Sequence, residues 1–294
     1  MIEMEKTSEF MDTHARLVDR RRFAFLFGDG GPDTVIAALA AYANADGGFG
    51  WGLHPDLPNP TSQPVGALNA FEILEEVGPA TSPLAGGLCD WLDGVSLADG
   101  GLPFALPGAD APGSAPPWTG VDHSRSSLHI TSAVCGVAHR VANHDPAVAG
   151  HRWLARATGY CRDAIANLER PGFAFEFHYV LHLLDTLHDK SADAARELER
   201  LGAFLPESAT MPIKGGAEDE KLRPLDFSPQ PDRPLREFVS ADVIAGDLDR
   251  LAGEQGDDGG WDVDFNVFTP AAALEWRGDA TVRALRVLRA NGRL

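Results

Sequence analysis

Apolar side chains recur along most of this chain at the three- and four-residue spacing of amphipathic helices. In the segment 65–77, Leu68, Phe71 and Leu74 lie on one stripe, and Gly78 with Pro79 ends the segment. Alternation with a period of two residues is too short to build a sheet, so the pattern predicts an all-α protein. The predicted helices span residues 14–26, 33–44, 65–77, 84–95, 124–141, 146–168, 173–187, 192–204, 240–251 and 270–290.

A short phrase, Asp-Gly-Gly followed by an apolar residue, stands between predicted helices three times. The copies are Asp46–Phe49, Asp99–Leu102 and Asp258–Trp261, and their Asp residues are separated by 53 and then by 159 residues, three times 53. This recurrence predicts an array of helical hairpins in which intervening copies have lost the phrase. Since 294 residues hold between five and six such units, we expect one domain over residues 1–294, folded as an (α/α)6 toroid with a central cavity.

Each part of the phrase suits a tight turn between helices. The Asp side chain accepts backbone N–H bonds within the turn. The paired glycines allow a positive φ and a close approach of neighbouring helices. The Phe, Leu or Trp that follows fills the space beside the hairpin, so we interpret these Asp residues as turn formers rather than as catalytic groups.

Two stretches depart from the helical pattern. Residues 103–120 form a long loop rich in Pro, Gly and Ala, and loops of this length are often lids or binding segments. Residues 206–234 contain six prolines and little periodicity, which predicts that one hairpin is degraded into irregular structure.

The chain carries 43 acidic and 25 basic side chains, a formal net charge of −18. Nucleic acids and anionic membranes bind basic patches, so we expect neither as a partner. The run Arg20–Arg22 is the one local exception, and we interpret it as a solvated helix face.

Several features predict a cytoplasmic protein. Residues 1–10 are not a signal peptide, and the longest apolar run, 35–43, is too short to span a membrane. The cysteines Cys89, Cys135 and Cys161 show no metal-binding spacing and lie in apolar helical segments, which favours buried free thiols.

The segments Asn44–Gly50 and Ala67–Leu74 resemble the repeat of terpenoid cyclases and protein prenyltransferase β subunits, the squalene cyclase-like α/α toroids. Gln255–Trp261, followed by Thr269–Ala273, is similar to the same repeat. The resemblance implies an (α/α)6 toroid whose reactive pocket lies inside the ring, near the N-terminal ends of the inner helices. The matching segments here are residues 51–63, 118–129, 175–182 and 262–269.

The resemblance offers two chemistries. Protein prenyltransferases hold zinc through Asp, Cys and His, and the nearest counterpart here, Val121–Ser124, has Ser124 where the thiolate would stand. Proton-initiated terpenoid cyclases use a DxDD motif, whose nearest match is Asp262–Phe265, with Phe265 in place of the last Asp. The resemblance therefore implies Asp264 as the acid, held neutral by apolar neighbours, and Asp262 as its partner, with a turn-capping role as the alternative.

Histidines supply the other candidates for chemistry. His178 and His182 are four residues apart on one helical face, close to Glu176, and without an HExxH signature they predict a polar pocket lining rather than a metal site. Together with His123, His178 would orient the substrate or accept a proton. The remaining candidates for substrate binding are aromatic or polar residues in the implied pocket segments: Trp51, His54, Asp56, Trp118, Asp122, Arg125, His129 and Phe175.

From these residues we expect a terpenoid cyclase-like enzyme that acts on a hydrophobic, isoprenoid-type molecule in the central cavity. The expected reaction is an acid-initiated cyclisation or isomerisation without a metal or cofactor. One alternative is a non-catalytic toroid that binds a partner protein or a lipid-like ligand. The other is a zinc-dependent prenyltransferase-like enzyme.

Overall fold

The computed structural model describes residues 2–79 and 82–294, and 57% of the chain is helical, which confirms an all-α protein. The longer helices are α1 (Met4–His14), α2 (Leu17–Phe27), α3 (Pro32–Ala40), α4 (Pro64–Val77), α5 (Pro83–Val95), α6 (Leu128–Val141), α8 (Arg152–Ala166), α9 (Ala174–Leu187), α10 (Ala192–Gly202), α12 (Ala241–Gly253) and α13 (Pro270–Ala290). Short elements are α7 (Pro146–Ala149), α11 (Pro224–Phe227), β1 (Met211–Pro212), β2 (Lys221–Leu222) and the 3-10 turns Pro116–Trp118, His188–Lys190 and Pro234–Phe238.

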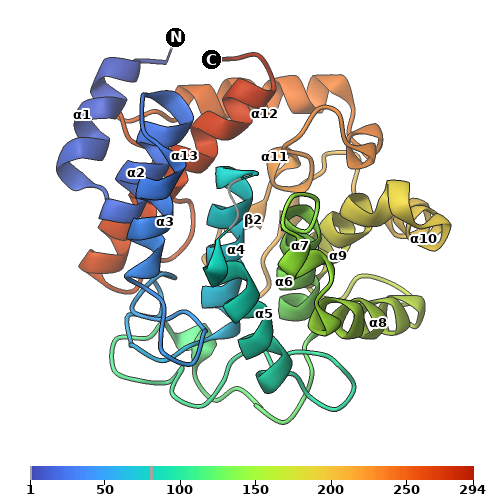
Figure 1. Ribbon diagram of the computed structural model, residues 1–294. Coiled ribbons are helices and arrows are strands. Elements are labelled where there is room, and N and C mark those ends of the chain that lie inside the picture. The colour runs from blue at the N-terminus through green and yellow to red at the C-terminus, as the bar shows by residue number, and fades with distance from the viewer. Residues whose placement is uncertain (1, 80–81) are drawn as a thin grey trace.

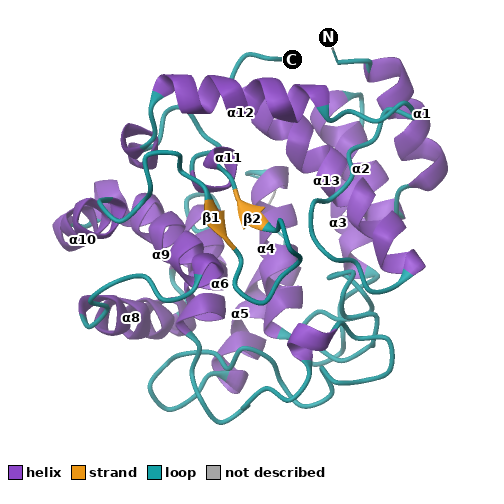
Figure 2. Cartoon of the chain, turned by 180° about the vertical axis from the view of Figure 1, so that it is seen from behind, coloured by secondary structure: helices purple, strands orange, loops and turns teal. Residues whose placement is uncertain are grey.

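Seven helices are neighbours in a succession that returns to its start. Helix α2 contacts α4, α4 contacts α6, α6 contacts α9, and α9 contacts α11. Helix α11 contacts α12, α12 contacts α13, and α13 contacts α2 again. Of the others, α3 packs on α4, α5 on α4, α8 on α6, and α10 on α9. Figures 1 and 2 show the two chain ends close together, beside α1, α12 and α13.

The three Asp-Gly-Gly turns share one geometry. Their middle residues, Gly47, Gly100 and Gly259, have φ angles of 91°, 91° and 90°. In each turn the Asp Oδ1 accepts a hydrogen bond from the N–H of the second glycine, at 2.9, 3.0 and 3.1 Å. The residues that follow are buried: Phe49, Leu102 and Trp261. The predicted roles of all three parts of the phrase are therefore confirmed.

Each turn also leans on the backbone of another helix. A Cβ atom on Gly47 would lie 2.7 Å from the carbonyl oxygen of Gly87 in α5, and one on Gly100 would lie 2.8 Å from that of Arg156 in α8. A Cβ atom on Gly259 would lie 2.3 Å from the carbonyl carbon of Lys6 in α1. The glycines thus let three turns meet three helices at backbone contact.

Most predicted helices match observed ones, and the exceptions have physical reasons. The predicted helix 146–168 is broken at Gly150 into α7 and α8. Helix α1 was not predicted, because its apolar residues are few and widely spaced. The stretch 206–234 is largely irregular, as expected, and contains the two-residue antiparallel pair β1–β2 and the short α11. The three cysteines are free and buried, as predicted.

The prediction of a solvated face for Arg20–Arg22 is wrong for Arg22. Arg21 is exposed and Arg20 is half-buried, but the Arg22 side chain is only 3% exposed. Successive residues on a helix point about 100° apart, so one member of a charge run can face the interior. Arg22 does so because three carboxylates receive it there.

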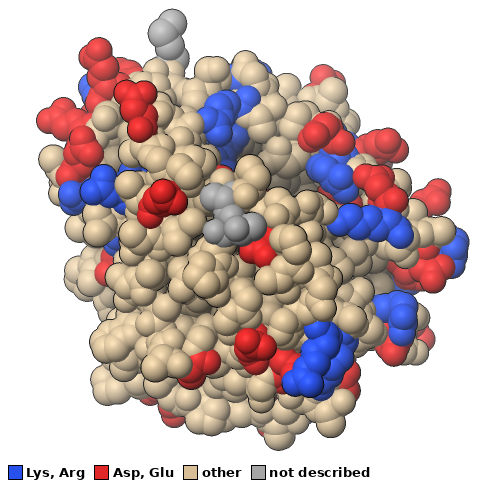
Figure 3. All heavy atoms as spheres, in the orientation of Figure 1, with Lys and Arg blue, Asp and Glu red and all other residues tan. Residues whose placement is uncertain are grey.

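The outer surface is mixed in charge. On the face drawn in Figure 3, acidic and basic side chains are interspersed toward the edges, and the middle carries few charges. Among the described residues, no helix combines the length and the apolar character needed to cross a membrane.

Candidate functional site

A cavity of about 660 Å³ lies between the helices of the closed succession. Its walls come from α2, α4, α6, α9, α11 and α13, together with the β1–β2 segment and residues 264–265. This volume falls within the range of pockets that hold small organic molecules. Helices α4 and α13 line it through their C-terminal halves, whereas α9 lines it from Phe175 in its first turn onward. The predicted position at N-terminal helix ends therefore fits α9 but not α4 or α13.

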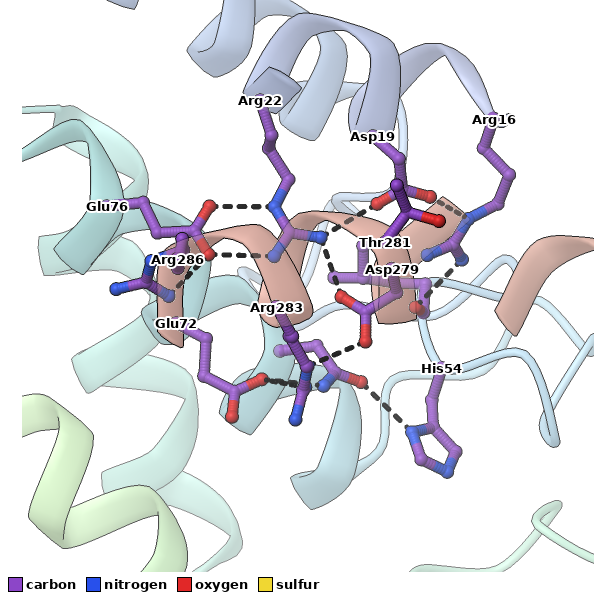
Figure 4. Close-up of polar contacts among 12 residues, drawn as sticks. Arg16, Asp19, Arg22, His54, Glu72, Glu76, Asp279, Thr281, Arg283 and Arg286 are labelled. Atoms are coloured by element: carbon purple, nitrogen blue, oxygen red, sulfur yellow. Dashed lines mark hydrogen bonds and ion pairs between the residues drawn. The ribbon is translucent and has the colours of Figure 1, made fainter. Parts of the chain in front are cut away.

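Ion pairs between α2, α4 and α13 form one side of the cavity, which we call the ionic wall (Figure 4). Glu76 accepts two hydrogen bonds from Arg22, both at 2.7 Å, and a third from Arg286 at 2.7 Å. Glu72 accepts one from Arg283 at 2.9 Å. The ionic wall consists of Arg22, Glu72, Glu76, Asp279, Arg283 and Arg286.

Helical spacing brings these residues together. Glu72 and Glu76 are one turn apart on α4, and Asp279, Arg283 and Arg286 follow each other at four and three residues on α13, so each set shares a helix face. The carboxylates of Asp279 and Glu72 raise the pKa of Arg283. The Arg283 side chain is nevertheless 45% exposed, because it faces the cavity.

The opposite side of the cavity is aromatic and comes from α9. Phe175, His178, Tyr179 and His182 share one face of this helix and line the cavity, and we call them the α9 wall. The two histidine rings are 4.4 Å apart between centroids. Burial lowers the pKa of both histidines and raises that of Tyr179, so the α9 wall is uncharged near neutral pH.

Asp226 on α11 stands beside the α9 wall. The Nε2–H of His182 donates a hydrogen bond of 2.8 Å to the backbone carbonyl of Asp226, and the Asp226 carboxylate accepts one of 2.7 Å from the N–H of Arg223. Burial raises the pKa of Asp226 to about 6, the Arg223 N–H opposes the shift, and the nearby Asp264 and Asp247 add to it. Asp226 is nevertheless an exposed residue, because its accessible surface faces the cavity.

Five of the residues predicted from the sequence line this cavity: Phe175, His178, His182, Asp264 and Phe265. Asp264 pairs with Arg223 at 2.8 Å and is 54% exposed. Asp262 points elsewhere, pairs with Arg277 and is 78% exposed. Asp262 and Asp264 therefore do not form the predicted pair, because each carboxylate binds a different arginine.

Four predicted residues lie in two aromatic clusters and not in the lining of this cavity. His54 packs edge-on against Trp118 and Trp276 at 5.3 and 5.0 Å, and Asp56 accepts a hydrogen bond of 3.0 Å from the Trp276 indole. A cavity of only about 10 Å³ remains there, room for about one water molecule. His129 lies among Phe104, Phe173, Phe175 and Tyr179, and burial lowers its pKa to about 4.

The remaining predicted residues are absent from the cavity lining. Trp51 is 56% exposed and donates to Asn44. His123 bonds the carbonyl of Ala105 at 2.8 Å, and Asp122 is exposed and bonds Ser124, whose hydroxyl lowers the pKa of that carboxyl. Arg125 is also exposed. Glu176 is half-buried, and burial raises its pKa.

Sequence reasoning missed several residues that line the cavity. These are Glu72, Tyr179, Asp226, Arg283 and Arg286. The sequence does contain a signal for Glu72, because the mainly apolar α4 carries Glu72, Glu75 and Glu76 at helical spacing on one face. No comparable signal marks Asp226, which lies in the irregular stretch.

Comparison with known proteins does not assign this chain to a family. No protein-family model and no curated protein matches this sequence. Within residues 2–79 and 82–294, no three His, Cys, Asp or Glu side chains are grouped so that they could hold a metal ion. Any statement about function therefore rests on the cavity itself.

Proposed function

We propose that the helices form an (α/α)6 toroid. The hairpins would be α1–α2, α3–α4, α5–α6, α8–α9, α10–α11 and α12–α13, with the second helix of each facing the cavity. The return contact between α13 and α2 supports this arrangement. The third Asp-Gly-Gly turn supports it as well. This turn follows α12 and packs against α1, just as the first two turns pack against α5 and α8. The hairpin α10–α11 is then the degraded one.

We further propose a distant relationship to terpenoid cyclases and protein prenyltransferase β subunits. The support is the repeated phrase with its shared turn geometry and the closed succession of helices. A common fold does not carry activity with it, so the chemistry must come from the cavity residues.

We infer that the protein is an enzyme that performs acid–base chemistry on a small molecule held in this cavity, with Asp226 as the proton donor. One observation carries this inference: Asp226 lines the cavity beside Asp264, burial raises the pKa of its carboxyl to about 6, and its backbone carbonyl accepts a hydrogen bond from His182. A group with a pKa near the working pH gives and takes a proton with small energetic loss. Perturbed carboxyls in pockets are typical of catalytic sites.

The neighbours of Asp226 have supporting roles in this proposal. Arg223 donates its backbone N–H to the Asp226 carboxylate and its guanidinium Nε–H to Asp264, so it holds the two carboxyls side by side. The charge of Asp264 favours a proton on Asp226. The sequence-based idea of two carboxyls with one proton is thus kept, with Asp226 as the acid and Asp264 as a positioning residue. Tyr179 and His178 would orient the substrate through hydrogen bonds.

The reaction class proposed is an acid-initiated isomerisation or cyclisation. Asp226 would transfer its proton to a double bond or carbonyl oxygen of the substrate, which becomes cationic. Loss of another proton from the substrate back to the Asp226 carboxylate would restore the enzyme and leave a rearranged product. No oxidant, reductant or leaving group is needed, because the proton given is recovered.

The test is substrate-independent. Purified protein is incubated in D2O with a small-molecule cell extract and, separately, with farnesol, and products are followed by mass spectrometry. We expect at least one compound to gain deuterium or change its retention with the wild-type protein, and Asp226→Asn to slow this change at least about 100-fold. Asp163→Asn, an exposed carboxyl paired with Arg162, is the matched control and should act like the wild type.

Equal conversion by the wild type and Asp226→Asn would remove Asp226 from the mechanism. If no compound changes while a compound is retained by the folded protein, the protein is the non-catalytic binding toroid instead.

A further inference from the structure

Most of the charges that line the cavity belong to ion pairs. Six basic and eight acidic side chains line it, so its formal charge is close to balance. Besides the ionic wall, Arg140 holds Glu75 with hydrogen bonds of 2.7 and 3.2 Å, and Arg233 holds Asp185 at 3.0 Å. A ligand with a large charge of either sign would have to compete with these internal pairs.

The paired groups keep unused hydrogen-bonding positions toward the cavity. Arg283 uses Nη2 with Glu72 and Nε with Asp279, and Arg286 uses Nη1 with Glu76. Among the described residues, no partner is recorded for Nη1 of Arg283, Nη2 of Arg286 or Oε1 of Glu72. This side of the cavity therefore offers both free donors and a free acceptor.

The Nδ1 of His178 is not a binding position in this structure. It has no hydrogen-bond partner within residues 2–79 or 82–294, but it is buried and solvent does not reach it. Its ring belongs to the α9 wall, across the cavity from the ionic wall, and Phe175 and Tyr179 present apolar ring surface beside it. The cavity thus combines polar groups on one side with aromatic faces on the other.

The geometry points to a neutral, hydroxyl-rich ligand of about the size of one or two sugar rings. A hydroxyl group can both donate and accept, which matches the free acceptor of Glu72 and the free donors of Arg283 and Arg286. The C–H face of such a ring packs on aromatic side chains such as those of the α9 wall. A hydrocarbon chain would instead bury these polar groups without partners, which is unfavourable. This assignment rests on the proposed location of the site and replaces the isoprenoid-type substrate expected from the sequence with a polar one.

The test compares binding of five probes by calorimetry and ligand-observed NMR. The neutral probes are maltose and myo-inositol, and the others are glucuronate, spermidine and farnesol. Binding is measured with the wild type and with Asp226→Asn, so that turnover does not enter the result. We expect a neutral probe to bind best, with a dissociation constant of about 1 mM or lower.

Two variants connect binding to the two walls of the cavity. The pair replacement Glu72→Leu with Arg283→Met removes an acceptor and a donor of the ionic wall together and should weaken binding of the neutral probe at least about tenfold. Tyr179→Phe removes one hydroxyl only, and it covers the case in which the double variant does not fold. Asp163→Asn should leave binding unchanged.

The inference is overturned if glucuronate, spermidine or farnesol binds more tightly than both neutral probes. It is also overturned if neither neutral probe binds when its concentration is about ten times the expected dissociation constant. The same holds if both cavity variants bind a neutral probe as tightly as the wild type does. Binding of a neutral probe without any conversion would contradict the proposed catalysis but not the ligand class. Conversion of farnesol would support the proposed catalysis but contradict the ligand class.

Discussion

Replacing Arg22 with methionine is expected to lower the free energy of unfolding by about 3–5 kcal/mol, the range for breaking a buried ion pair on one side. Arg22 is 3% exposed and joins Asp19 of its own helix to Glu76 of α4 and Asp279 of α13. Methionine fills a similar volume but leaves these carboxylates buried without their shared partner. The measurement is equilibrium unfolding in urea at neutral pH.

The stability that Arg22→Met loses should decrease as the pH falls. Burial alone would raise the pKa of Glu76 and of Asp279, but the arginines outweigh it and hold both pKa values below their ordinary ones. A lowered carboxyl pKa stabilises the folded protein above the ordinary pKa, and this contribution is lost as the pH falls through the folded value. The gap between the wild type and Arg22→Met should therefore be full at neutral pH and should shrink below about pH 4.

The neighbouring arginine is the matched control for this experiment. Arg21 is exposed on the same helix, and Arg21→Met should change stability by no more than about 0.5 kcal/mol. If the two variants lose equal stability, the ion pairs between α2, α4 and α13 do not hold these helices together.

The second large effect is expected at Gly259. Alanine there should lower the free energy of unfolding by about 3 kcal/mol or more, because it adds backbone strain to steric overlap. Gly259 has a φ of 90°, and its Cβ would lie 2.3 Å from the Lys6 carbonyl carbon and 2.5 Å from the Thr7 nitrogen. The variant should also release α1, whose Thr7 hydroxyl donates to the Gly259 carbonyl at 2.9 Å. Urea unfolding and hydrogen exchange of the α1 amides measure the two effects.

Gly215 separates strain from overlap. Its φ is 87°, but a Cβ there would meet nothing within 4 Å, so Gly215→Ala should lower stability by only about 1–2 kcal/mol. Equal losses at Gly215 and Gly259 would mean that the contact between the turn and α1 contributes little.

The fold was more predictable from the sequence than the site. The phrase Asp-Gly-Gly has a local physical meaning, since only glycine adopts the φ of Gly47, Gly100 and Gly259 easily, and its spacing therefore reports the repeat. Helix α13 begins and ends where periodicity predicts, with Thr269 as its N-cap and Pro270 in its first turn.

The site residues depend on contacts that one sequence does not record. Arg22 looks like part of a surface charge run until its partners on α4 and α13 are known, and these are 54 and 257 residues away. Asp226 lies in an irregular stretch without periodicity, and its raised pKa comes from burial in the folded chain. His178 and His182 were found because their four-residue spacing on a helix is visible locally.

The most direct test of the account is the titration of the Asp226 carboxyl by carbon-13 NMR, with Asp226→Asn used to assign its resonance. We expect a pKa of about 6, well above the ordinary 3.8 of an aspartate, because the carboxyl is buried in the wall of the cavity. A pKa at or below 3.8 would contradict it, since the carboxyl would then hold no proton to give near neutral pH.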